Sequence, residues 1–156
     1  MARQNKSAKQ IGGPFIATAV LCQSIAEDSD RVLSVQRIID ELRGVIPHDA
    51  PADFPSKSKP LEVQLFALVI IRRGDAPAGK HKLRLVIERP DGKRTEATKM
   101  DIEMPKYPNG AANVKAKMSM KLHSPGVFWI DVILDKRRLT RMALNVLIQR
   151  LEKISP

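Results

Sequence analysis

The chain has little cysteine and few aromatic side chains. Its 156 residues include one cysteine, Cys22, so an intramolecular disulfide cannot form. Small secreted domains usually depend on several disulfides, and a lone cysteine therefore favours a reducing compartment, which we take to be the cytoplasm. A chain of this length buries roughly two-thirds of the surface that its unfolded form exposes, so it needs neither a disulfide nor a metal to fold.

Long apolar segments are missing as well. The longest uninterrupted apolar run, residues 65–71, is far shorter than the roughly 20 residues with which a helix spans a bilayer. Near the start, Arg3, Lys6 and Lys9 are not followed by the apolar core of a signal peptide. The sequence thus predicts neither insertion into a membrane as a helix nor export by a signal peptide.

Positive charge is in excess. Lys and Arg number 27 against 17 Asp and Glu, which gives a formal net charge of +10 and a pI of about 10.1. A field of this sign concentrates anions and favours contact with nucleic acid or acidic surfaces. Because the positive residues are scattered rather than gathered in blocks, a merely solvated surface explains the excess equally well.

Alternation of apolar and polar residues is the main structural signal. It is clearest at 81–88, and the turn residues 90–93 that follow predict a hairpin in which 94–103 returns antiparallel. The same pattern, or an apolar run beside turn residues, predicts strands at 15–22, 61–71, 114–122 and 127–134. Residues 44–60 contain four prolines and are predicted to form an irregular loop.

Two segments, 32–42 and 139–150, fit a helix or a strand, although the tight spacing after 127–134 favours a hairpin for the second. With both taken as strands, the chain has about seven to eight strands, which is typical of an antiparallel β-sandwich. We therefore predict an all-β fold with three parts: a flexible basic N-terminal tail at 1–12, a sandwich domain at 13–149 and a C-terminal tail at 150–156.

Five segments carry motifs of strands and turns, at 19–22, 32–40, 53–55, 79–93 and 126–135. Through them the chain resembles a family of uncharacterised bacterial proteins, a domain of unknown function, over about 14–148. The resemblance implies a strand at 32–42 and an immunoglobulin-like sandwich, and it brings no activity, cofactor or site. The chain departs from the family pattern at Arg37, where a small residue is common, and at Lys136, where the last hairpin often has glycine.

Catalytic signals are weak. A thiol nucleophile needs a base within hydrogen-bond reach, and Cys22 with His48, His81 or His123 gives the available combinations. No local signature accompanies them, and a cysteine inside an apolar strand is usually an inert core residue. An enzyme that uses Cys22 is therefore a remote alternative.

Ligand signals are weak too. The three histidines are isolated from one another and from Cys22, which does not suit a transition-metal site. His48, Asp49 and Asp53 could hold a cation in the proline-rich loop, but such a loop is more often only solvated. The glycines do not form a phosphate-binding loop that opens a helix. We predict no cofactor and no small-molecule ligand.

One acid and one large aromatic share a face of a predicted strand. Asp131 and Trp129 alternate with the apolar residues of 127–134, so both point away from the core. The simplest explanation is packing at a sheet end under a loop, because tryptophan often covers such ends.

Basic residues recur on the polar faces of several strands and near the last turn. If the strands that carry them are neighbours, they form a patch that could contact an anion or nucleic acid. Two other readings remain: lysines on edge strands also discourage aggregation, and single-strand binders usually add stacking aromatics, of which the chain has only six. The candidate contact residues are Lys82, Arg84, Lys115, Lys117, Lys121, Lys136, Arg137 and Arg138, with Arg141 close by.

The residues thus make strands and turns rather than a recognisable reaction site. We predict a non-catalytic β-sandwich that acts as an interaction or assembly module, with a protein partner or a second copy of itself. The alternative is an accessory protein that binds nucleic acid through a basic sheet face.

Overall fold

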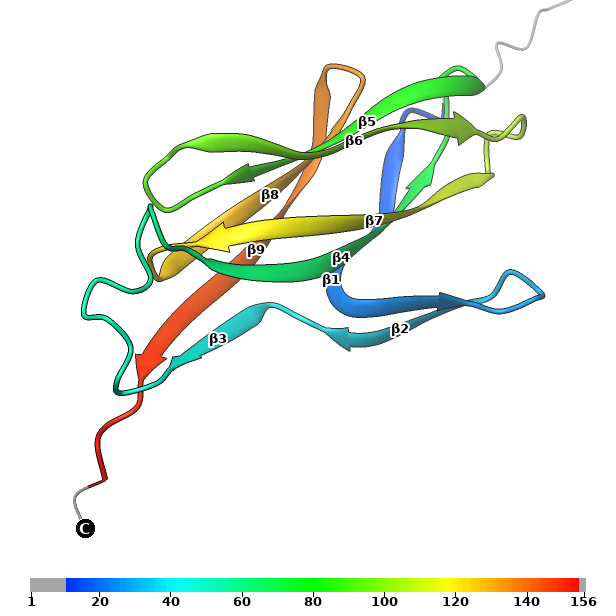
Figure 1. Cartoon of the computed structure of the whole chain (residues 1–156). Helices are drawn as coiled ribbons and strands as arrows, with labels where there is room; N and C mark the ends of the chain where they lie inside the picture. Colours follow the sequence, from blue (N-terminus) through cyan, green and yellow to red (C-terminus); the bar gives the residue numbers. More distant parts are fainter. Residues whose placement is uncertain (1–10, 155–156) are drawn as a thin grey trace, which may run out of the picture.

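A computed structural model describes residues 11–154, which form nine strands in two sheets (Figure 1). The sheets pack face to face, and the described residues contain no helix long and apolar enough to cross a membrane. The strands are β1 (Phe15–Glu27), β2 (Leu33–Ile38), β3 (Glu41–Ile46), β4 (Leu61–Arg72), β5 (Gly79–Glu88), β6 (Arg94–Met104), β7 (Ala111–Leu122), β8 (Gly126–Leu134) and β9 (Arg137–Arg150).

The strand order is that of an immunoglobulin-like sandwich. One sheet has the order β2-β1-β4-β7 and the other β3-β9-β8-β5-β6. With β2 and β3 set aside, chain order β1, β4, β5, β6, β7, β8, β9 matches strands A, B, C, C′, E, F and G, with A-B-E in one layer and G-F-C-C′ in the other. The structure therefore confirms the all-β immunoglobulin-like sandwich.

Period-two burial places the core between the sheets. In β7 every second residue is buried, from Ala112 to Leu122, and the residues between them are exposed. The other strands contribute their inward side chains to the same core, in which Phe128, Met118, Met120, Leu83 and Leu144 are among the largest fully buried residues. The outer faces of the two sheets consequently point in opposite directions.

The segment 32–42 differs from the single strand that the family resemblance implied. It forms β2 and the start of β3, which lie in different sheets. The chain crosses between the sheets at two consecutive residues: the Ile39 amide donates to the Leu21 carbonyl oxygen (2.8 Å), and the Asp40 carbonyl oxygen accepts from the Asn145 amide (2.9 Å). This crossing explains why the structure has more strands than the sequence predicted.

β3 brings a second correction, because it pairs with β9 in parallel rather than antiparallel. It also extends to Ile46, so the irregular loop begins later than residue 44. Arg150 is likewise the last residue of β9 rather than the first residue of a tail. Its guanidinium donates to the carbonyl oxygens of Ala50 (2.7 Å) and Pro51 (2.9 Å) and so fixes the loop to the sheet.

The structure also bears on the predicted N-terminal tail and on the two predicted hairpins. Most of the predicted N-terminal tail, residues 1–10, lies outside the described part, as do residues 155–156. Gly12 already contacts the sandwich, because the Asp75 amide donates to its carbonyl oxygen (2.8 Å). The hairpins β5–β6 and β8–β9 are confirmed. In the second, Asp135 rather than Lys136 has the positive φ (55°), so a glycine is not needed at Lys136.

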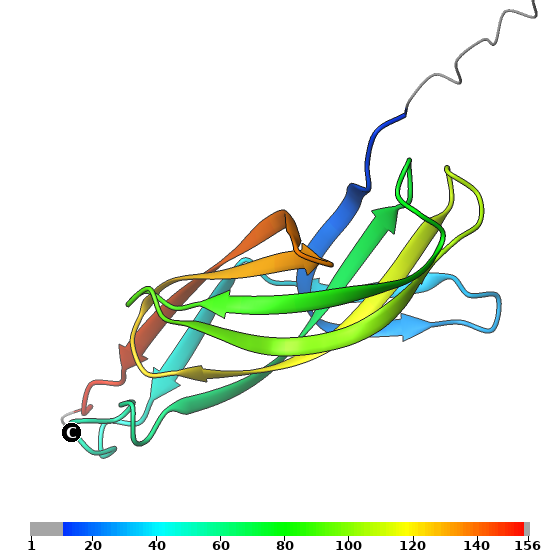
Figure 2. The ribbon, with the colours of Figure 1, turned by 90° about the horizontal axis from the view of Figure 1, so that it is seen from above.

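Beyond Cys22, β1 and its partner β2 form a hairpin arm that passes along the outer side of β4 and β7. In Figures 1 and 2 the arm leaves β4 and passes below β4 and β7. An ion pair between Glu27 of β1 and Lys115 of β7 joins the arm to that face. Cys22, at the base of the arm, is fully buried although it lies outside the inter-sheet core.

Candidate functional site: an arginine cluster on the five-stranded sheet

A buried carboxylate lies on the solvent side of the five-stranded sheet. Asp131 belongs to β8, which is in the interior of that sheet, and it alternates with the core residues Ile130 and Val132. Its side chain is nevertheless 0% exposed, because long side chains from neighbouring strands cover it. Trp129 and Asp131 do share a sheet face as the sequence predicted, but the expectation of packing at a sheet end is wrong, since β8 has a partner strand on each side.

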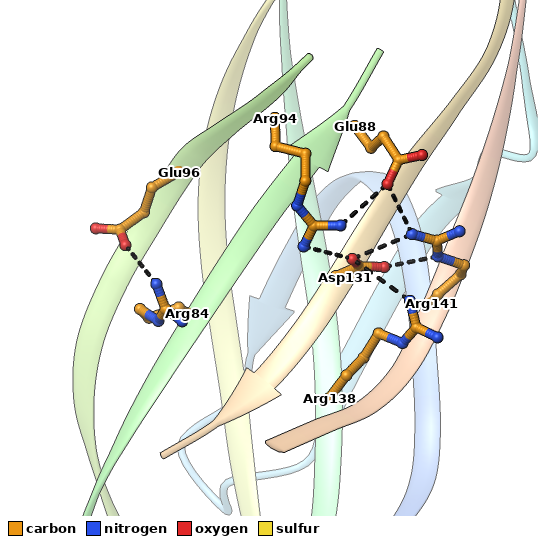
Figure 3. Close-up of polar contacts among 7 residues, drawn as sticks. All are labelled: Arg84, Glu88, Arg94, Glu96, Asp131, Arg138 and Arg141. Atoms are coloured by element: carbon orange, nitrogen blue, oxygen red, sulfur yellow. Dashed lines mark hydrogen bonds and ion pairs between the residues drawn. The ribbon is translucent and has the colours of Figure 1, made fainter. Parts of the chain in front are cut away.

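Three arginines surround Asp131 (Figure 3). Arg141 stands directly opposite it on β9 and binds both carboxylate oxygens, at 2.7 Å through Nε and 3.2 Å through Nη2. Arg94 of β6 reaches Oδ2 through Nη2 at 2.9 Å. Arg138 forms a looser ion pair, 3.8 Å from Oδ2. We call Glu88, Arg94, Asp131, Arg138 and Arg141 the arginine cluster.

Glu88 of β5 completes the cluster. Its Oε2 accepts from Arg94 Nη1 (3.0 Å) and from Arg141 Nη2 (2.9 Å), so each of these arginines bridges two carboxylates. The Arg141 guanidinium also lies over the Trp129 ring, 5.1 Å from its centroid, which is the geometry of a cation–π contact. Three positive and two negative charges leave the cluster with one net positive charge.

The electrostatics of the cluster are those of an ion-pair network, not of an acid–base site. The hydrogen bonds from Arg141 and then Arg94 hold the pKa of Asp131 below its ordinary value, although burial acts in the opposite direction. Hydrogen bonds to Asp131 first and then to Glu88 raise the pKa of Arg141. Asp131 therefore stays ionised and positions the arginines.

Arg138 is the arginine of the cluster whose N–H donors are used least by the cluster's carboxylates. Its side chain is 53% exposed, and its distance to Asp131 is an ion-pair distance, longer than a hydrogen bond. A guanidinium carries five N–H donors in a planar fork that matches a carboxylate or a phosphate. Arg138, held beside the fixed Arg94 and Arg141, can therefore bind an external anion.

Exposed apolar side chains lie on the same outer face. Val127 of β8 is 41% exposed, Leu147 of β9 40% and Val45 of β3 57%. Val127 of β8 is in register with Asn145 of β9. Leu147, two residues further along β9, is in register with Arg43 of β3, and Val45 lies two residues beyond Arg43 on the same side of β3. Among these apolar side chains the same face also carries Asn145 of β9 and an ion pair between Glu41 and Arg43 of β3 (2.7 Å).

The predicted basic patch is divided between two faces. Lys82 and Arg84 lie on β5 in the five-stranded sheet, where they pair with Asp101 (3.9 Å) and Glu96 (3.4 Å) of β6. Lys115, Lys117 and Lys121 lie on the outer face of β7 in the other sheet. The condition that these strands be neighbours is not met, so the eight residues do not form one patch. Lys136 and Arg137 lie at the β8–β9 turn, and Arg138 belongs to the arginine cluster.

The residues considered for catalysis and metal binding lie apart from this cluster. The Cys22 thiol is buried, contacts the Phe66 carbonyl oxygen at 3.7 Å and has its pKa raised by burial. His81 bridges the Pro77 carbonyl oxygen (2.7 Å) and Asp135 (2.8 Å). Within residues 11–154 no three His, Cys, Asp or Glu side chains are grouped as for a metal ion, His48, Asp49 and Asp53 included.

The fold and the cluster define an all-β sandwich domain with a charged outer sheet face. The chain belongs to a family of unknown function (DUF6941), whose model matches residues 17–147. No curated protein matches it.

Solved structures that match this chain do so at low identity, and three of them follow. The CARDB domain of a Pyrococcus furiosus protein in complex with di-metal ions has a TM-score of 0.41 and 10% identity, and the match covers 90% of this chain and 97% of that one. An immunoglobulin-like protein from Pseudomonas aeruginosa has a TM-score of 0.34 and 13% identity, over 90% of this chain and 100% of that one.

The third structure is the Pseudomonas fluorescens alkylpurine DNA glycosylase AlkC bound to DNA that contains an abasic site analog. It has a TM-score of 0.39 and 9% identity, over 69% of this chain. This chain spans only 27% of the AlkC chain. All three similarities are too distant to carry a conclusion about function.

Proposed function

We propose that this chain is a non-catalytic interaction module that binds a partner protein through the outer face of its five-stranded sheet. The observation that carries the proposal is that one sheet face carries both the arginine cluster and the exposed side chains of Val127, Leu147 and Val45. The cores of protein interfaces are enriched in arginine and aromatic residues, and their energetic centres are often Trp, Tyr and Arg.

The chemistry of the face suggests the kind of partner. An acidic side chain of the partner would accept hydrogen bonds from Arg138, next to the fixed guanidinium of Arg141. Apolar partner side chains would cover Val127 and Leu147. A second copy of the chain is one such partner, and light scattering of the purified protein tests for it.

The enzyme alternative has less support. A cysteine nucleophile reacts as its thiolate, and burial raises the pKa of Cys22 and so keeps the thiol protonated. We therefore propose no catalytic role for Cys22. The cytoplasmic location stays a prediction that rests on this single cysteine.

The nucleic-acid alternative rests on charge alone, and the division of the basic residues weakens it. Three of the eight candidate residues, Lys82, Arg84 and Lys115, are already paired with carboxylates. Phosphate neutralisation would make binding to DNA or RNA fall steeply with salt, so a salt titration with both nucleic acids tests this alternative.

A pull-down with matched variants tests the proposal. The baits are the wild type, Arg138→Glu, Leu147→Asp and a control, Lys117→Glu, which changes an exposed lysine on the opposite sheet face. Nuclease treatment removes proteins held through nucleic acid. We expect one set of proteins with the wild type and the control, and its loss with the two face variants. Equal recovery with all four baits, or recovery that nuclease abolishes, would contradict the proposal.

A further inference from the structure

The first part of one edge of β4 has no strand beside it. β4 pairs with β7 over its whole length, from Leu61 to Arg72. β1 pairs with β4 only as far as Cys22 and Phe66, and then turns away into the hairpin arm. Residues 61–65 therefore have a neighbouring strand on one side only. Such an edge presents unpaired N–H and C=O groups, onto which another extended segment can add.

A groove follows this open edge. It has a volume of about 590 Å³ and lies between residues 63–65 of β4, the crossing at Ile39 and the start of β3. Val63 and Leu65 on one side and Ile39 and Leu42 on the other contact the hydrophobic core, and polar side chains line the groove around them: Gln23, Glu41, Arg43 and Gln64. We call it the edge groove.

Arg37 stands at the rim of the edge groove in an unusual conformation. Its φ of 53° lies in the left-handed region, which favours glycine or asparagine over arginine. The side chain is exposed and forms none of the ion pairs found among residues 11–154. Strained residues that are kept in spite of their cost cluster at binding sites. The unpaired guanidinium fits an acidic group in the groove.

We propose that the edge groove binds an extended peptide segment of a partner protein, which adds to β4 as a strand of about five residues, the length of the open edge. Because side chains alternate along a strand, every second residue of the peptide is apolar and faces Leu42 and Val63. The residues between them face outwards, and one of them is an acid beside Arg37. This surface goes beyond the sheet face proposed above, which it adjoins at Glu41 and Arg43 of β3.

Fluorescence anisotropy with a labelled peptide of alternating valine and glutamate tests the proposal, and a peptide of the same composition with its valines grouped is the control. We expect the alternating peptide to bind the wild type, and Arg37→Glu to weaken it at least about tenfold. Arg31→Glu is the matched protein control, because Arg31 is also exposed, has a φ of 65° and lies in the β1–β2 turn. It should bind as the wild type does.

Arg37→Gly separates binding from folding. Glycine suits the left-handed backbone, so this variant should melt no lower than the wild type and still lose affinity for the peptide. Arg138→Glu should keep its affinity for the peptide, so the two proposed surfaces fail separately.

Hydrogen exchange locates the bound peptide. We expect the alternating peptide to slow exchange at 61–65 of β4 and not in β6, an edge strand of the five-stranded sheet. Protection in β6, equal binding of both peptides, or equal affinity of Arg37→Glu and Arg31→Glu would overturn the proposal.

Discussion

Replacing Asp131 by asparagine removes the charge that holds the arginine cluster together. The variant keeps the size of the side chain but leaves Arg94 and Arg141 with Glu88 as their remaining carboxylate, and it removes the ion-pair partner of Arg138. Asp131 accepts two hydrogen bonds from Arg141 (2.7 and 3.2 Å) and forms an ion pair with Arg94 at 2.9 Å. Breaking a fully buried ion pair costs roughly 3–5 kcal/mol.

The expected loss is smaller than that value, because Arg94 is 45% exposed and Arg141 27% exposed, and water can take over part of their hydrogen bonding. We expect Asp131→Asn to lower the free energy of unfolding by about 2 kcal/mol. For a domain of this size that corresponds to a fall in Tm of roughly 4–8 °C. Urea denaturation at pH 7 measures the free energy, and a thermal melt measures Tm.

A control and a pH series make this prediction specific. Asp101→Asn removes an exposed carboxylate 3.9 Å from Lys82 and should cost less than about 0.5 kcal/mol. The pKa of Asp131 is lowered in the folded state, so its contribution is present above the unfolded pKa of about 3.9 and is lost as pH falls through the folded value. The gap between wild type and variant should therefore close in acid. A loss no larger than that of Asp101→Asn, or a gap that does not depend on pH, would refute the reasoning.

Three further predictions concern other parts of the fold. Burial disfavours the imidazolium of His81, but its hydrogen bonds to Asp135 and Pro77 outweigh burial and raise the pKa of His81. The pair of His81 and Asp135 should therefore stabilise the protein below about pH 6.5 and stabilise it less as pH rises through the folded pKa. A plot of Tm against pH should fall over this range in the wild type and be flatter in Asp135→Asn. Arg150→Ala should free the loop that precedes β4, and limited proteolysis should cut it faster there. Arg37→Gly should raise the free energy of unfolding by up to about 1 kcal/mol in urea denaturation, because it removes left-handed strain; a lower stability would contradict that account.

The sequence was sufficient to predict the sandwich, because period-two burial is a local signal. The hairpin β5–β6 and the alternation along β7 could both be seen without knowing which strands are neighbours. Long-range placement could not be seen. Lys82 and Lys117 carry the same kind of pattern, yet topology sends them to opposite faces. The crossing at Ile39 and Asp40 also has no local periodicity that distinguishes it from a continuous strand.

The arginine cluster was missed for a related reason. Asp131 and Trp129 were correctly placed on one face, but their partners come from three other strands, through Arg141, Arg94 and Glu88. The available signal was an acid in the middle of an otherwise apolar strand. A carboxylate on the outer side of such a strand needs a cationic neighbour if other side chains bury it. Which of the 27 basic residues supplied it depended on strand order.

Site-specific photo-cross-linking tests most directly whether the outer face of the five-stranded sheet binds a protein. A photoreactive amino acid is placed at Val127 or Leu147, which are exposed on that face, and at Lys117 on the opposite face as a control. In cells of the organism that encodes the protein, we expect a discrete, nuclease-resistant protein adduct from the first two positions and none from the third. No adduct from Val127 or Leu147, or the same adduct from Lys117, would contradict the proposed interface.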